Sequence, residues 1–230
     1  MKQIFLPNNP EISVQIRHSA RARRLSLRIS SLDGKVTLSG PPYVRERDYM
    51  AFIRDKEDWI IKNLVVMPEK TLVAADAVLV YRGSPVTVTM ASQRGVRLAG
   101  DAIYVERTSR SIGASIKGFL KSQARDALAH ASDRYAAQLG VGYSALVLRD
   151  TRSRWGSCSS QGQLMYSWRL IMAPPDILDY VAAHEVAHLI EMNHSRAFWN
   201  VVARLYPDYE KAREWLRSHG PMLHRYDFDT

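Results

Sequence analysis

Cysteine is nearly absent from the sequence, because Cys158 is the only one in 230 residues. A single cysteine excludes an intramolecular disulfide and is typical of proteins that fold in a reducing compartment. Long apolar runs are also missing, since charged or polar residues interrupt every apolar stretch and residues 1–11 hold no hydrophobic segment of an export signal. The sequence therefore predicts a cytoplasmic protein without a membrane partner.

Acidic residues are in short supply: Asp and Glu number 23 against 32 Lys and Arg, which gives a formal net charge of +9. The basic residues are densest between Arg17 and Arg28, a segment with five arginines and no acid. Such a segment is typical of a solvated strand face, and also of a surface that attracts polyanions. Nucleic acid is therefore a candidate partner, although charge alone does not identify one. The oligomeric state is not indicated.

Apolar residues make up 46% of the chain, which is enough for a packed core. Residues 1–110 predict a β-rich N-terminal subdomain with one helix, whose apolar stripe runs from Tyr49 to Leu64. A meander of three strands precedes that helix and further strands follow it. The predicted strands are residues 12–16, 25–29, 35–39, 72–81, 85–90 and 102–105.

Residues 111–230 have a different pattern, which predicts a second domain and makes the whole chain an α+β protein. Apolar residues three and four positions apart predict a long helix from Ser111 to a stop at Gly140. The elements predicted after it are a strand over 145–149, a loop over 152–162, a strand over 164–170 and a helix over 177–192, which Pro174-Pro175-Asp176 introduce.

The helix predicted over residues 177–192 carries two histidines, His184 and His188, four residues apart. That spacing stacks both rings on one face, where they can share a tetrahedral cation, and Glu185 can reach a water on that cation without becoming a ligand. His194 lies six residues past His188, where the chain can bend back and bring a third imidazole to the same point. We therefore predict a metal site of His184, His188 and His194 with Glu185 as the catalytic residue.

Two alternatives remain open for these residues. The histidines could be ordinary members of a buried helix, although burying imidazoles and a carboxylate without partners is costly. Glu191 could replace His194 as the third ligand, as a carboxylate does in other zinc peptidases. Zinc suits the predicted ligands, and nickel or cobalt would fit them as well.

Several segments resemble the YgjP-like metallopeptidase family, within the wider zincin group that also holds the SprT-like proteins. They are HEVAHLIEMNHSRAFW at 184–199, RWGSCS at 154–159, PPDILDY at 174–180, RRLSLR at 23–28 and DWIIK at 58–62. The resemblance implies zinc held by His184, His188 and His194, with Glu185 as the catalytic carboxylate. It also implies that residues 111–230 form a zincin-like domain with an active-site helix beside a mixed or antiparallel sheet.

The predicted reaction is the hydrolysis of a peptide bond. Glu185 would take a proton from the attacking water and pass it to the leaving amine. The strand over 164–170 would be an edge strand that pairs with a peptide or unfolded protein substrate. An oxyanion donor is also needed, and the sequence offers five candidates without ranking them: Arg154, Tyr166, Tyr180, His219 and His224.

Two other functions compete with this one. A DNA-associated protease, like the SprT-like relatives, would use the basic amino-terminal half, but the sequence has no zinc-finger cysteines and no recognisable nucleic-acid module. A metal-containing nucleic-acid-binding protein would need only a structural metal, which leaves Glu185 without a purpose. The remaining cysteine and the tryptophans are predicted to be packing residues: Trp59, Trp155, Cys158, Trp168, Trp199 and Trp215.

Overall fold

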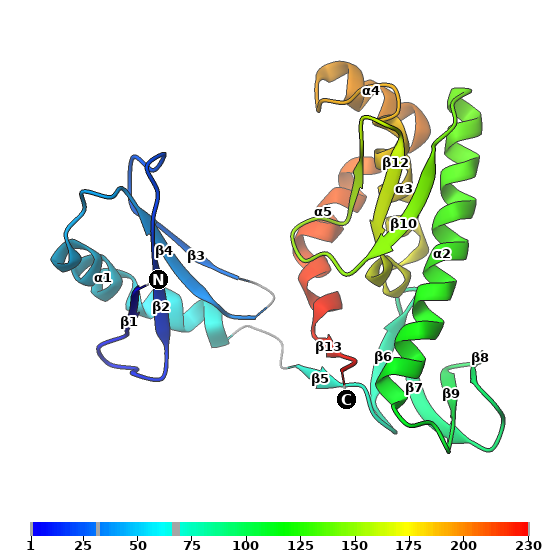
Figure 1. The fold of residues 1–230 in the computed structure, drawn as a ribbon, viewed down its shortest axis with the longest axis horizontal. Coiled ribbons are helices and arrows are strands. Elements are labelled where there is room, and N and C mark those ends of the chain that lie inside the picture. The colour runs from blue at the N-terminus through cyan, green and yellow to red at the C-terminus, as the bar shows by residue number, and fades with distance from the viewer. Residues whose placement is uncertain (1, 31–32, 66–69, 230) are drawn as a thin grey trace. The chain divides into compact units, whose positions relative to one another are not determined.

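The helices and strands of the chain form an α+β fold, which confirms the predicted class. A computed structural model describes residues 2–30, 33–65 and 70–229 (Figure 1). They belong to two compact units, Met1–Glu69 and Lys70–Thr230, each with its own hydrophobic core.

The division between the units falls after residue 69 and not after residue 110, where the change of sequence pattern placed it. The physical reason is that the strands after Lys70 have no separate core. Val88 and Ile103 of those strands are fully buried in the same cluster as Leu120 of the long helix that follows.

The first unit is a four-stranded sheet with one helix. Its strands β1 (Lys2–Phe5), β2 (Ser13–His18), β3 (Ser26–Ile29) and β4 (Val36–Gly40) lie in the order β1-β2-β4-β3, and α1 (Glu46–Val65) follows them. The predicted meander is wrong, because β2 and β4 are adjacent and parallel. This pairing sets Val14 and Ile16 beside Val36 and Leu38, and all four side chains are buried.

Helix α1 covers one face of this sheet with the apolar stripe that the sequence predicts. Tyr49, Ile53 and Ile60 are at most 2% exposed and join the core of the first unit. Trp59 is 45% exposed, so its predicted place in the core is wrong. It lies one residue before Ile60, and a step of about 100° around the helix turns it towards solvent.

The second unit begins with β5 (Thr71–Leu72), which pairs with β13 (Tyr226–Asp227) near the other end of the chain. The strands β6 (Val78–Tyr81), β7 (Ser84–Ala91), β8 (Val96–Ala99) and β9 (Ala102–Glu106) form a sheet in the order β6-β7-β9-β8. The long helix α2 (Ile112–Leu139) packs against this sheet and then runs beside β10 (Figure 1). Its predicted ends are confirmed, since Ser111 caps its first turn and Gly140 ends it in a left-handed conformation with φ of 68°.

The sheet beside the histidine helix has three strands. They are β10 (Ala145–Arg149), β11 (Gly156–Cys158) and β12 (Gln163–Ser167), in the order β10-β12-β11. β12 is parallel to β10 and antiparallel to β11, so the sheet is mixed. The prediction of an edge strand over 164–170 is wrong, because β12 lies in the centre, ends at Ser167 and continues as the 3-10 helix η1 (Trp168–Met172).

Three helices complete the second unit: α3 (Pro175–Ala187), α4 (Arg196–Leu205) and α5 (Tyr209–His219), with the short 3-10 helix η2 (Gly220–His224) after them. α3 ends at Ala187 and not near Met192. The amide N–H groups of Ile190 and Glu191 both donate to the carbonyl of Ala187, which turns the chain back there. None of the helices in the described part of the chain is both long and apolar enough to cross a membrane.

Candidate metal centre

Three imidazoles converge at the C-terminal end of α3. His184 lies in its last turn, His188 follows its last residue, and His194 lies in the loop before α4. One ring nitrogen of each lies within 4.8 Å of the other two, and the Nε2 atoms of His184 and His194 are 3.2 Å apart. Nitrogens bound at 2.0–2.1 Å to a tetrahedral cation lie about 3.3–3.4 Å from each other. The observed separation therefore suits a shared ion.

Among the described residues, no other group of three histidine, cysteine or acidic side chains could hold a cation. Glu191, the alternative third ligand, takes another part. Its backbone carbonyl lies 2.9 Å from Nδ1 of His188 and can accept a hydrogen bond from that nitrogen. This hydrogen bond leaves Nε2 of His188 as the free lone pair, which is the usual arrangement around a metal-binding histidine.

The ring of Phe198 packs against all three imidazoles. Its side chain is fully buried, and its ring centroid lies 4.3 Å from that of His188, 4.8 Å from that of His194 and 4.9 Å from that of His184. The position of Phe198 follows from the start of α4, where Ser195 accepts a hydrogen bond from the Phe198 N–H and caps the helix as predicted. This buried ring limits the rotation of all three imidazoles.

The protonation states also suit metal binding. Burial, together with the neighbouring His188 and His194, lowers the pKa of His184 to about 3. Burial lowers the pKa of His188 as well, against the opposing effect of its hydrogen bond to the Glu191 carbonyl. Both imidazoles are therefore neutral at physiological pH, with lone pairs available to a cation. The buried Nδ1 of His184 has no hydrogen-bond partner among the described residues.

Glu185 projects from α3 towards β11 and is only 5% exposed. Burial raises the pKa of its carboxyl to about 8, although the positive charge of Arg154 opposes this. The carboxyl lies directly against Gly156, where an added Cβ would come within 2.5 Å of the Glu185 Cγ and Oε1 atoms. A glycine at position 156 therefore makes room for this carboxyl.

A pocket of about 420 Å³ opens over the histidines and Glu185. Residues of α3 form its floor, β11 and the residues before it form one wall, and Met192 and Leu216 contribute apolar surface. Cys158 lines the β11 wall, and its thiol is kept protonated because burial and the nearby Glu185 raise its pKa. The pocket thus combines three imidazoles, a buried carboxyl and the unpaired edge of a strand.

A family profile described as "YgjP-like, metallopeptidase domain" matches residues 23–219. The chain belongs to the YgjP-like family. A comparison with curated proteins gives no match. Among solved structures, the chain is similar to the metallopeptidase zymogen of Pyrococcus abyssi abylysin, at 22% identity and a TM-score of 0.34, over 41% of this chain and 94% of that one. The family match shows that this YgjP-like chain carries a metallopeptidase domain.

The structure of this YgjP-like domain separates the five candidate oxyanion donors. Arg154 and Tyr180 line the pocket, and the ring of Tyr180 meets His184 edge-on at 5.9 Å. Tyr166 is fully buried and its hydroxyl lies 3.0 Å from that of Ser132, so it belongs to the core. The remaining two do not line the pocket: His219 stacks on Trp215, and His224 packs against Trp155 with its ring tilted by 39°.

Two residues that the sequence did not single out, Phe198 and Gly156, shape this site. Phe198 stands four residues after His194, at the first buried position of a helix capped by Ser195, which is the available signal for a ring packed behind the histidines. Gly156 carried no signal, because its role depends on a helix almost thirty residues later in the chain. Trp155, as predicted, packs beside the site, against His224 at 5.3 Å.

Proposed function

We propose that this YgjP-like chain is a zinc-dependent endopeptidase that acts on extended or unfolded polypeptide, with Glu185 as the general base. The observation that carries the proposal is the convergence of three imidazoles beside a buried carboxyl, in a pocket that is open to solvent along a strand edge. A purely structural metal site is closed and has no need of such a carboxyl.

Zinc held by His184, His188 and His194 would supply Lewis acidity and lower the pKa of a bound water to about 7. The carboxylate of Glu185 would accept the proton of the attacking water and return it to the leaving amine. A cation close by favours the ionised carboxylate and so opposes the effect of burial on the pKa of Glu185. Burial raises the pKa of Tyr180 to about 12, so its hydroxyl keeps the proton it would donate to an oxyanion.

The edge of β11 supports a backbone-directed mode of substrate binding. The Ser167 N–H donates to the Trp155 carbonyl at 2.8 Å, and the Ser159 N–H donates to the Gln163 carbonyl at 3.0 Å. Residues 155, 157 and 159 are therefore the ones whose backbone groups point towards β12. The alternation of an antiparallel ladder then turns the N–H and C=O groups of Gly156 and Cys158 towards the opposite edge. No other strand of the described chain pairs with β11, so an extended peptide could add there.

The test compares the wild-type chain with Glu185→Gln and His188→Ala after loading with zinc, nickel or cobalt. We expect the zinc-loaded wild type to cut an unfolded protein such as reduced casein. Glu185→Gln should bind one zinc per chain and lose activity by at least about a hundredfold. His188→Ala should lose both the metal and the activity.

Two results would contradict the proposal. One is that wild type with one zinc per chain cuts no unfolded protein, and the other is that Glu185→Gln retains full turnover. Greater activity with nickel or cobalt than with zinc would overturn the choice of metal while leaving the role of Glu185 in place.

A further inference from the structure

The sheet of the first unit has one face that α1 does not cover. Residues paired across neighbouring strands lie on the same face, and alternate residues of a strand lie on opposite faces. Val14, Ile16, Val36 and Leu38 point into the core with α1, so the residues between them point the other way. We call this second face, which includes Gln15, Arg17, Thr37 and Ser39, the outer face.

Arginine and small polar side chains occupy one end of the outer face. Arg17 of β2 pairs with Ser39 of β4, which pairs with Ser26 of β3. In the next row Thr37 of β4 pairs with Arg28 of β3. Both arginines are exposed, and neither forms an ion pair with a carboxylate of the described residues. The face therefore offers two guanidinium groups with hydroxyl groups between them.

Amide side chains and one aromatic ring continue this face towards β1. Gln15 of β2 pairs with Gln3 of β1, and Ser13 pairs with Phe5. Phe5 is 54% exposed, so its ring is open to solvent on this face. An exposed ring on a polar sheet is a platform on which a base can stack.

Charge is divided unequally between the two sides of the first unit. The four strands contain no acidic residue, and the loop between β2 and β3 adds three exposed arginines, Arg21, Arg23 and Arg24. That loop passes the end of β4 next to Arg17, since the Ser19 N–H donates to the Gly40 carbonyl at 2.9 Å. α1, on the opposite side, holds five acidic residues: Glu46, Asp48, Asp55, Glu57 and Asp58.

We propose that the outer face of the first unit, with its adjoining arginine loop, binds single-stranded nucleic acid. Arg17, Arg28 and the loop arginines would contact phosphates, the hydroxyl and amide groups would donate hydrogen bonds to phosphates or base edges, and Phe5 would stack on a base. The absence of acids from these strands gives the charge complementarity that a polyanion requires. An exposed ring on this face favours unstacked bases over a duplex, whose bases are not available for stacking.

The experiment measures binding of the full-length chain to fluorescent oligothymidine, oligouridine and a DNA duplex, each of about 20 nucleotides, between about 0.05 M and 0.2 M salt. We expect both single strands to bind more tightly than the duplex. The double variant Arg17→Gln/Arg28→Gln should weaken binding by at least about tenfold and reduce the slope of log affinity against log salt by about 1.4, because each phosphate contact on a single strand contributes about 0.7.

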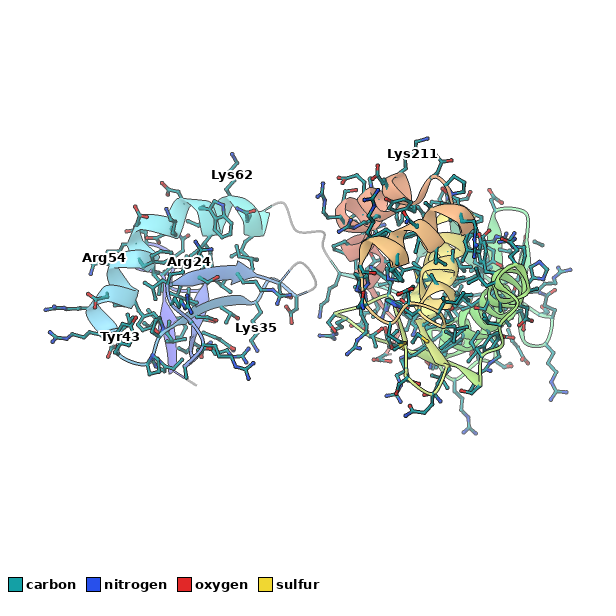
Figure 2. The ribbon with its side chains drawn as sticks, turned by 90° about the horizontal axis from the view of Figure 1, so that it is seen from above. Arg24, Lys35, Tyr43, Arg54, Lys62 and Lys211 are labelled. Carbon is teal, nitrogen blue, oxygen red and sulfur yellow. The ribbon has the colours of Figure 1, made fainter. Side chains whose placement is uncertain are left out.

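Matched controls lie on α1. Arg54→Gln/Lys62→Gln removes the same charge from α1, from which Lys62 projects away from the strands (Figure 2), and should leave the slope nearly unchanged. Phe5→Ala should weaken binding roughly five- to a hundredfold without a change of slope, and Phe5→Tyr should restore it. Trp59→Ala, which removes an exposed ring from α1, should have little effect.

Three results would overturn the proposal. The first is that neither single strand binds at the lowest salt concentration. The second is that the outer-face and α1 charge variants weaken binding equally, which would indicate general attraction by net charge. The third is that the duplex binds more tightly than both single strands. A preference between oligothymidine and oligouridine would identify the ligand as DNA or RNA, and the proposed binding surface would be the same in either case.

Discussion

At the scale of single residues, the site depends on a glycine that makes room for a carboxyl. Gly156→Ala would place a methyl group within 2.5 Å of the Glu185 Cγ and Oε1 atoms, which is closer than these atoms can approach, so the Glu185 side chain has to shift. We expect Glu185 to be displaced and the activity to fall on the order of a hundredfold, because a misplacement of about 1 Å at a catalytic group has such an effect. Peptidase assays and zinc content measure the outcome.

The three atoms closest to the added methyl group all belong to Glu185 and none to a histidine, so this variant should still bind one zinc per chain. Gly142→Ala is the matched control, since nothing lies within 4 Å of a Cβ added there, and it should keep wild-type activity. Full activity in Gly156→Ala would show that the position of the Glu185 carboxyl is not critical.

The convergence of the three histidines could be predicted from the sequence at this scale because their geometry is mostly local. Two of them are four residues apart on one helix, and the third lies just beyond its end. The partners of these residues could not be predicted in the same way. Gly156 and Glu185 are neighbours only because β11 packs beside α3, and the contact has no trace in either local segment.

At the scale of elements, β11 is a strand of three residues whose outer edge faces the site. Cys158→Pro removes an N–H from that edge and leaves the ladder with β12 intact, because residue 157 makes the bonds to β12. We expect KM for an unfolded substrate to rise by up to about tenfold, the effect of one hydrogen bond. Cys158→Ser keeps the N–H and removes only the thiol, so it should behave as wild type.

Steady-state kinetics on the two variants, with zinc content as a check, distinguish the roles of backbone and thiol. An equal effect of Cys158→Ser and Cys158→Pro would assign the loss to the side chain and contradict pairing at this edge. An unchanged KM in Cys158→Pro would show that the Cys158 N–H does not bind the substrate.

Long elements were predictable from the sequence, and the shortest strands were not. The ends of α2 follow from an apolar repeat over 28 residues with Ser111 and Gly140 at its ends. β1, β8 and β11 have three or four residues each, which is too short for an alternating apolar pattern to mark a strand, although each pairs with the strand that follows it in the chain. The parallel pairing of β2 with β4 joins strands that are not consecutive in the chain, and no turn signal encodes it.

Arg169 connects separate segments of the second unit. Its guanidinium donates to both carboxyl oxygens of Asp150, at 2.7 and 3.2 Å, and to the carbonyls of Leu223 and Tyr226 near the C-terminus. Burial opposes ionisation of Asp150, but the hydrogen bonds and charge of Arg169 outweigh it and hold its pKa below the usual value. Asp150 therefore contributes stability above its unfolded pKa of about 3.9, and this contribution is lost as the pH falls through the lower folded value.

Asp150→Asn should lower the free energy of unfolding by about 1–2 kcal/mol at pH 7. This is at the low end for hydrogen bonds between charged groups, because the Asp150 side chain is 37% exposed and solvent weakens the interaction. The difference from wild type should shrink as the pH falls below about 4. Urea unfolding at a series of pH values measures it. Asp229→Asn is the control. Asp229 pairs with Lys117, but its side chain is 82% exposed, so the variant should have the same free energy of unfolding as the wild type. A difference independent of pH would contradict the role of the charge.

At the scale of the whole molecule, the described residues form two cores that share no residue. Ile53 is fully buried in the first unit and Leu128 in the second, and replacing either by alanine should cost about 2–5 kcal/mol. If each unit unfolds around its own core, Ile53→Ala will speed hydrogen exchange in α1 and β2 and leave zinc binding and exchange in α3 unchanged. Leu128→Ala will do the reverse and weaken zinc binding. Faster exchange of both units in either variant would show that the chain unfolds as one cooperative body.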